Sequence, residues 1–139
     1  MSATCSMLHR QLLLTALYTP DNFVPLDMLY AALAYRTPLV NSSGTTVDEP
    51  TVGDYARVPI PLDSDHWIVT SFGEAVTLTD TVFPTPSVDW GLLISWVLLD
   101  SPIGGGILSA GSLVVPTYFV AGQDPPILGA GLIVTGLYD

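Results

Sequence analysis

The stretch LLISWVLL (Leu92–Leu99), followed by DSPIGG (Asp100–Gly105) and GILSAGSL (Gly106–Leu113), decides the fold class. Two apolar runs of this length, separated by a turn rich in Gly, Pro and Asp, are typical of paired β-strands. The glycines of this turn precede a predicted strand and no helix, so they do not form the start of a phosphate-binding helix. We therefore predict a hairpin turn at this place.

Short apolar runs of the same kind fill much of the chain. They lie at Leu26–Arg36, Tyr55–Ile60, Trp67–Phe72, Ala75–Leu78, Thr81–Phe83, Tyr118–Val120 and Leu132–Leu137. Turn-forming residues lie between them at Pro61–Asp65, Pro84–Ser87 and Gly122–Pro126. Many short strands joined by Gly and Pro turns predict an all-β fold, either a β-sandwich or a partly open barrel. The length of 139 residues predicts a single domain that spans residues 1–139.

Three segments complete the predicted layout. Ser6–Leu17 is rich in helix-forming residues and free of Gly and Pro, which predicts one N-terminal helix that ends before the next proline. Leu26–Arg36 fits either a helix or a strand by its periodicity, and we favour a strand because prolines on both sides limit its length. Asn41–Gly53 is a polar run of Ser, Thr, Gly, Asp and Pro, which predicts a long loop.

The chain is acidic and poor in charged residues. These make up 12% of the sequence, about half the usual share, and the formal net charge is −10. Arg10, Arg36 and Arg57 are the basic residues, and lysine is absent. Nucleic-acid binding, Walker-type phosphate loops and Schiff-base chemistry are therefore excluded, and an anionic membrane surface would repel the chain. Because Cys5 is the only cysteine, a disulfide within the chain and a cysteine-based zinc site are excluded, and we expect no cofactor.

One cluster has the residue types of a chemical site: DSDH (Asp63–His66), in which two carboxylates and an imidazole could hold a hard cation or zinc. Its spacing matches no complete metal-binding loop, so we interpret it as a solvated turn and expect no metal site. Ser, His and Asp occur without a Gly-x-Ser-x-Gly motif, and Glu49 and Glu74 are the only glutamates for glycosidase chemistry. We therefore assign no catalytic residue and interpret the chain as a non-enzymatic protein.

Two spaced motifs occur in the middle of the chain. Glu49 is followed after five residues by Tyr55-x-Arg57, and Phe83-Pro84 is followed after five residues by Trp90-Gly91. In their order and spacing, together with the predicted helix and the Gly-rich turn, they resemble a family of small tailed-bacteriophage virion structural proteins that are often labelled tail fibre proteins. The resemblance covers nearly the whole chain. It implies a non-enzymatic virion component that is assembled in the host cytoplasm.

Five residues in or beside these motifs are candidates for an interface between subunits: Glu49, Tyr55, Arg57, Asp89 and Trp90. The Arg57 guanidinium can pair with Glu49 inside the subunit or with a carboxylate of a neighbouring subunit. Trp90 is either a core tryptophan or an aromatic ring against a neighbouring backbone, for which the glycine after it leaves room.

A charge-poor, apolar composition suits burial in an assembly. We expect other virion proteins as partners, either the major capsid protein or tail proteins, and a homo-oligomer in which a trimer is one option. Because the chain has no fibre-like repeats, we favour a capsid decoration or cement subunit over the alternative, a tail, collar or tail-fibre component with a receptor- or glycan-binding role. That alternative requires an exposed row among the aromatic residues Tyr18, Tyr30, Tyr35, Trp67, Trp90, Trp96, Tyr118 and Tyr138.

Overall fold

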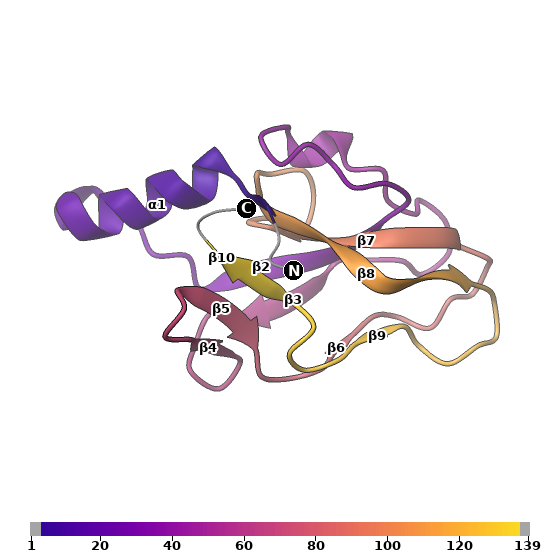
Figure 1. Cartoon of the computed structure of the whole chain (residues 1–139). Helices are drawn as coiled ribbons and strands as arrows, with labels where there is room; N and C mark the ends of the chain where they lie inside the picture. Colours follow the sequence, from indigo (N-terminus) through magenta and orange to yellow (C-terminus); the bar gives the residue numbers. More distant parts are fainter. Residues whose placement is uncertain (1–3, 137–139) are drawn as a thin grey trace.

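The hairpin formed by β7 (Gly91–Leu99) and β8 (Ile107–Phe119) lies at the centre of the computed structural model, which describes residues 4–136 (Figure 1). Both strands belong to a five-stranded antiparallel sheet in the order β1-β8-β7-β2-β3. The other strands of this sheet are β1 (Thr4–Cys5), β2 (Met28–Ala34) and β3 (Val58–Pro61). The hairpin predicted from the sequence is therefore confirmed.

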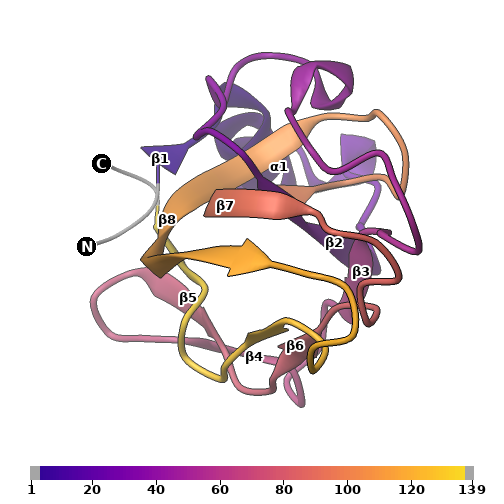
Figure 2. The same cartoon turned by 90° about the vertical axis from the view of Figure 1, so that its right-hand side faces the viewer.

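Two smaller sheets form a second layer below the five-stranded sheet (Figure 2). They consist of β10-β5-β4 and β6-β9, with β4 at Trp67–Val69, β5 at Glu74–Thr77, β6 at Thr81–Val82, β9 at Ile127–Leu128 and β10 at Val134–Gly136. The main core packs between the layers and includes Leu33, Leu93, Phe83 and Ile133. The sheets do not close into a barrel, and the prediction of an all-β fold with one N-terminal helix is confirmed.

The strands β2 and β7 are covered on both faces, which explains their nearly unbroken apolar sequences. Trp96 of β7 faces the main core, whereas Val97 belongs to a second cluster on the other face of the sheet. This second cluster is covered by Val40 and Val47, from the segment that includes the 3-10 helix η2 (Gly44–Thr46). The segment from Val40 to Val47 therefore covers the outer face of the sheet.

The helix α1 (Met7–Tyr18) begins at Ser6, whose hydroxyl accepts a hydrogen bond of 3.1 Å from the backbone N–H of His9. It ends at Thr19, ahead of the short 3-10 helix η1 (Pro20–Asn22), so the predicted helix is confirmed. Figure 1 shows α1 projecting beyond the sheets at one end of the molecule. No helix in the described part of the chain is long and apolar enough to cross a membrane.

Several predicted strand boundaries differ from the structure. The runs Gly106–Leu113 and Tyr118–Val120, predicted as separate strands, belong to the single strand β8, whose pairing with β7 is irregular between Leu93 and Ser95. The run predicted from Tyr55 becomes a strand only at Val58, because the preceding side chains enter the network described below. The short strands β1 and β9 were not predicted, and the predicted end of the last strand, Leu137, lies outside the described residues.

Candidate functional site

Arg57 and Glu49 form an ion pair in the interior of the subunit, with 2.6 Å between Nη2 and Oε1. The Arg57 side chain is only 5% exposed, and its Nε also donates to the Glu49 carboxylate, at 3.0 Å from Oε1. Nη1 donates to the carbonyl oxygens of Ser101 and Gly104, at 2.9 Å each, and Nη2 donates to that of Gly44 at 3.1 Å. Together these contacts use all five N–H groups of the guanidinium. We call this network the Arg57 clamp.

The Arg57 clamp fixes two loops against each other. The backbone N–H of Gly44 donates to the Gly105 carbonyl at 2.8 Å, and a Cβ added at Gly44 would lie 2.1 Å from the carbonyl oxygen of Gly104. Inside the β7–β8 turn, the Asp100 carboxylate accepts a hydrogen bond of 2.8 Å from the N–H of Gly106. The turn 100–106 and the segment 44–49 therefore form one firmly connected unit, which we call the clamped loops.

Tyr55 joins the Arg57 clamp to the core. Its hydroxyl donates to Glu49 Oε2 at 2.7 Å and accepts from the N–H of Leu33 at 3.0 Å. Burial, and then the Glu49 charge, raise the pKa of the Tyr55 phenol well above its usual range. Its ring meets the Trp90 ring edge to face, and it stacks on Phe83 with 6.3 Å between ring centroids. The two motifs of the sequence thus meet in one aromatic cluster.

Trp90 lies in the core, with 2% of its surface exposed. Its carbonyl accepts a hydrogen bond from the Tyr35 hydroxyl, and Gly91 follows it with a φ of 94°, a left-handed conformation that favours glycine. Asp89 is the exposed member of the five interface candidates, and its carboxylate accepts from the N–H of Ala121 at 2.9 Å. Trp90 is therefore a core residue, whereas Glu49, Tyr55 and Arg57 are half-buried and line a surface depression, with the ion pair between Glu49 and Arg57 formed within the subunit.

The DSDH cluster forms an exposed turn. Asp63 Oδ1 accepts hydrogen bonds from the N–H groups of Asp65 and His66 and lies 2.6 Å from His66 Nδ1. The hydrogen bond with His66 lowers the pKa of the Asp63 carboxyl. This is the local bonding that Asp commonly provides in turns. Within residues 4–136, no group of three or more His, Cys, Asp or Glu side chains is placed to hold a metal ion.

At the end of the molecule that carries the clamped loops, Ile103 is 85% exposed. It lies between Ser101 and Gly104, whose carbonyl groups are both held by Arg57. A depression with a volume of about 650 Å³ lies beside it and is also lined by Val47 and Pro50. Sequence reasoning missed Ile103 because the turn was interpreted only through its glycines. The sequence feature that could have identified it is a large apolar residue in a turn whose other residues are mostly small or polar.

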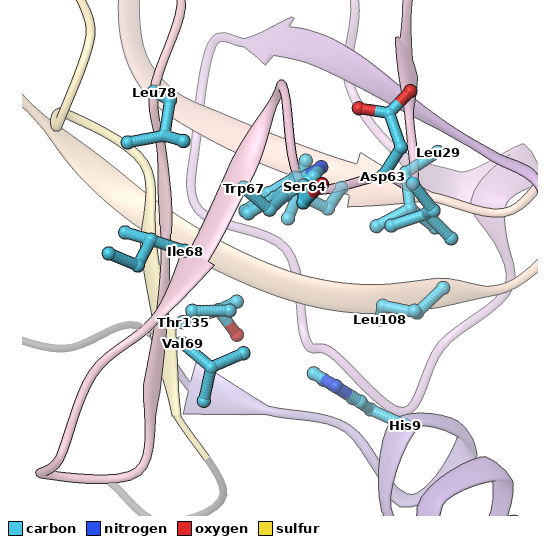
Figure 3. A pocket seen from close by; sticks show the side chains of 13 residues that line it. His9, Leu29, Asp63, Ser64, Trp67, Ile68, Val69, Leu78, Leu108 and Thr135 are labelled. Atoms are coloured by element: carbon cyan, nitrogen blue, oxygen red, sulfur yellow. The ribbon is translucent and has the colours of Figure 1, made fainter.

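A second surface feature is an apolar groove of about 640 Å³ between α1 and the sheet that contains β4 (Figure 3). Its lining includes Leu29, Leu108, Ile68 and Val69. Figure 3 shows His9 of α1 pointing into this space, toward the side of the groove formed by Val69 and Thr135. Sequence reasoning missed the groove because it forms between segments that are distant in the sequence.

Two exposed aromatic residues of the described chain, Tyr18 and Tyr118, lie far apart. Trp90 and Trp96 are buried in the core, whereas Tyr18 and Tyr118 are exposed. Tyr18 ends α1, and Tyr118 lies near the end of β8, which Figure 1 places on the opposite side of the molecule. Tyr138 lies outside the described residues. The exposed rings of Tyr18 and Tyr118 therefore do not belong to one stacking surface.

Both sequence motifs are thus used to hold the core and two loops together, as in a structural β-protein. The chain matches the family model described as podophage GP4 fiber I protein gp80 over residues 4–135, and it belongs to that family. It is therefore a phage fibre-type structural protein and a virion component, which confirms the resemblance found in the sequence. No curated protein matches the chain.

Proposed function

We propose that the chain is a non-enzymatic subunit of the tail-fibre region of a podophage virion, attached to a neighbouring virion protein through its clamped loops. The fibre description of the family supports a tail position and gives no support to capsid decoration, which the absence of fibre-like repeats had favoured. Capsid decoration is therefore the alternative that the localisation experiment below tests.

Ile103 is the observation that carries the attachment surface. The Ile103 side chain is 85% exposed and adjoins the depression lined by Val47 and Pro50, so it extends an apolar surface, and exposed apolar patches mark interaction sites. The Arg57 clamp holds the backbone on both sides of Ile103, so little conformational freedom is lost when a partner binds. Glu49, Tyr55 and Arg57 act in this proposal as positioning residues, and Ile103 is the residue that enters a pocket of the partner.

The attachment is tested with phage that encode Ile103→Asp. We expect the variant protein to fold and to be missing from purified particles, because a charge cannot enter an apolar pocket without a partner. Val24→Asp is the matched control, since Val24 is 79% exposed and lies outside the clamped loops. Quantitative mass spectrometry of the particles measures the ratio of this subunit to the major capsid protein. Incorporation of Ile103→Asp at the wild-type ratio would contradict the attachment surface.

The position in the virion is tested by cryo-electron microscopy of intact particles that carry the wild-type subunit. Density at the tail, in a small number of copies, supports the fibre role. Density at many symmetry-related sites on the shell would contradict the fibre role and support capsid decoration. In either case the map also reports whether the end with Ile103 or another face touches the neighbour.

A further inference from the structure

The helix α1 carries apolar side chains on opposite faces. Leu8 and Leu12 face the body of the protein and pack against the main core. Met7, Leu14 and Leu17, which recur at helical spacing, face outward and are exposed. An isolated helix of 12 residues is only marginally stable in water, and the exposed side of α1 carries these apolar side chains next to Arg10 and Gln11. The outward stripe therefore lacks a cover within residues 4–136.

The groove beside α1 also lacks a cover. Nδ1 of His9, Nε1 of Trp67 and Oγ1 of Thr135 all belong to residues that line it, and each atom is buried without a hydrogen-bond partner among the described residues. A buried polar atom without a partner costs about 1–3 kcal/mol, so these three atoms weaken the packing of the groove wall. The accessible lining of the groove is mostly apolar, which indicates an occupant with apolar side chains.

We propose that the outward stripe of α1 from a second copy of this chain packs into the groove, and that two copies exchange these contacts around a two-fold axis. The stripe offers Met7, Leu14 and Leu17 for the apolar lining, and Arg10 lies on the same exposed side of the helix. Because each copy carries one helix and one groove, a single symmetric contact covers all four surfaces, as in isologous dimers.

Charge favours the same occupant. The chain as a whole carries a formal net charge of −10, so two copies repel each other over most of their surfaces. In contrast, α1 contains Arg10 and no acidic residue, whereas the groove is lined by Asp63 and contains neither lysine nor arginine. The proposed contact therefore brings Arg10, the charged residue of α1, toward the groove that is lined by the Asp63 carboxylate. It goes beyond the proposed function and does not depend on where the virion carries the protein.

The first test is the mass of the full chain in solution, measured by light scattering and by sedimentation equilibrium over a wide range of concentrations. We expect twice the chain mass of 14.8 kDa. Leu17→Glu on the stripe and Val69→Glu in the groove should each produce a monomer with an unchanged circular dichroism spectrum, because both side chains are exposed. Val114→Glu on β8 is the matched control for Val69→Glu, because Val114 is 79% exposed and Val69 is 74% exposed. The control variant should stay dimeric.

The second test is a cross-link between copies in a Cys5→Ala background. Chains with Leu14→Cys are mixed with chains that carry Val69→Cys, and mild oxidation should join the two kinds to each other. A wild-type monomer at all concentrations would overturn the inference, as would a dimer that survives both the stripe and the groove substitutions. A monomeric wild-type protein would not affect the proposed tail position or the proposed Ile103 contact, which are tested by the virion experiments described above.

Discussion

The ring of Tyr55 meets the ring of Trp90 edge to face, with 5.2 Å between centroids and 89° between planes. These residues come from the two separate motifs of the sequence, so the contact shows that both motifs serve one interior cluster. Edge-to-face pairs of this kind contribute about 0.5–1.5 kcal/mol beyond the apolar area that they bury. The Tyr55 hydroxyl extends the cluster to Glu49, and through it to Arg57.

Arg57→Ala should destabilise the fold by about 3–5 kcal/mol, because it leaves the Glu49 charge buried without its partner. It also removes the donors of three loop carbonyl groups. Urea unfolding, followed by tryptophan fluorescence, measures the loss in the free energy of unfolding.

The matched control for this prediction is Arg36→Ala. Arg36 pairs with Asp48 at 3.0 Å, but the two side chains are 78% and 41% exposed. Exposed ion pairs contribute about 0.2–1 kcal/mol, so this variant should be close to the wild type. Equal losses for Arg36→Ala and Arg57→Ala would show that the Arg57 clamp does not stabilise the fold.

Gly44→Ala should lower the free energy of unfolding by about 1–3 kcal/mol, the usual cost of forcing a methyl group into a filled space. The new Cβ would lie 2.1 Å from the backbone oxygen of Gly104, so the two loops would have to move apart. Gly129→Ala is the control, because its Cβ would have its nearest neighbour at 4.0 Å. Thermal unfolding of both variants checks the prediction. The prediction is wrong if Gly44→Ala unfolds at the same temperature as Gly129→Ala.

Raising the pH should destabilise the protein from about pH 10 upward. The pKa of Tyr55 is raised in the folded state by burial and by Glu49, so the unfolded chain loses its phenol proton first and alkali favours unfolding. The pKa of Tyr35 is also raised, by burial and then by Asp48, and adds to the effect. Tyr55→Phe should make the decline of stability between about pH 10 and pH 11 shallower, and an identical slope would refute this assignment.

Lowering the pH should reduce the free energy of unfolding through the protonation of His9. Burial lowers the pKa of this imidazole in the folded state, so the unfolded chain takes up the proton first as the pH falls through about 6.5. Stability is therefore present above that value and declines below it. His9→Gln removes the titrating group and should flatten this part of the profile of unfolding free energy against pH. His66→Gln, at the exposed turn, serves as the control.

The fold was largely predictable where local chemistry decides it. The apolar run of β7, the turn after it and the helix capped by Ser6 all follow from the sequence. The continuous strand β8 was not predictable, because Pro116 and the irregular pairing opposite Leu93 interrupt the strand pattern. Pro116 is tolerated because β1 pairs with β8 only at residues 109 and 110, and a sheet edge requires no N–H there.

The site was predictable only in part. The pairing of Arg57 with Glu49 could be anticipated, since a lone basic residue near a carboxylate in an apolar chain needs a partner. The roles of Ser101, Gly104 and Gly44 could not, because they contribute backbone carbonyls and any residue type supplies these. The groove beside α1 requires the relative placement of a helix and two sheets, which no local pattern contains.

The complete use of the Arg57 guanidinium inside the subunit has a consequence for evolution. All five N–H groups of Arg57 are used within the subunit, so this side chain serves the architecture of the two loops. Phages could therefore exchange Ile103 or the outward leucines of α1 to fit a new virion or host while the interior stays the same.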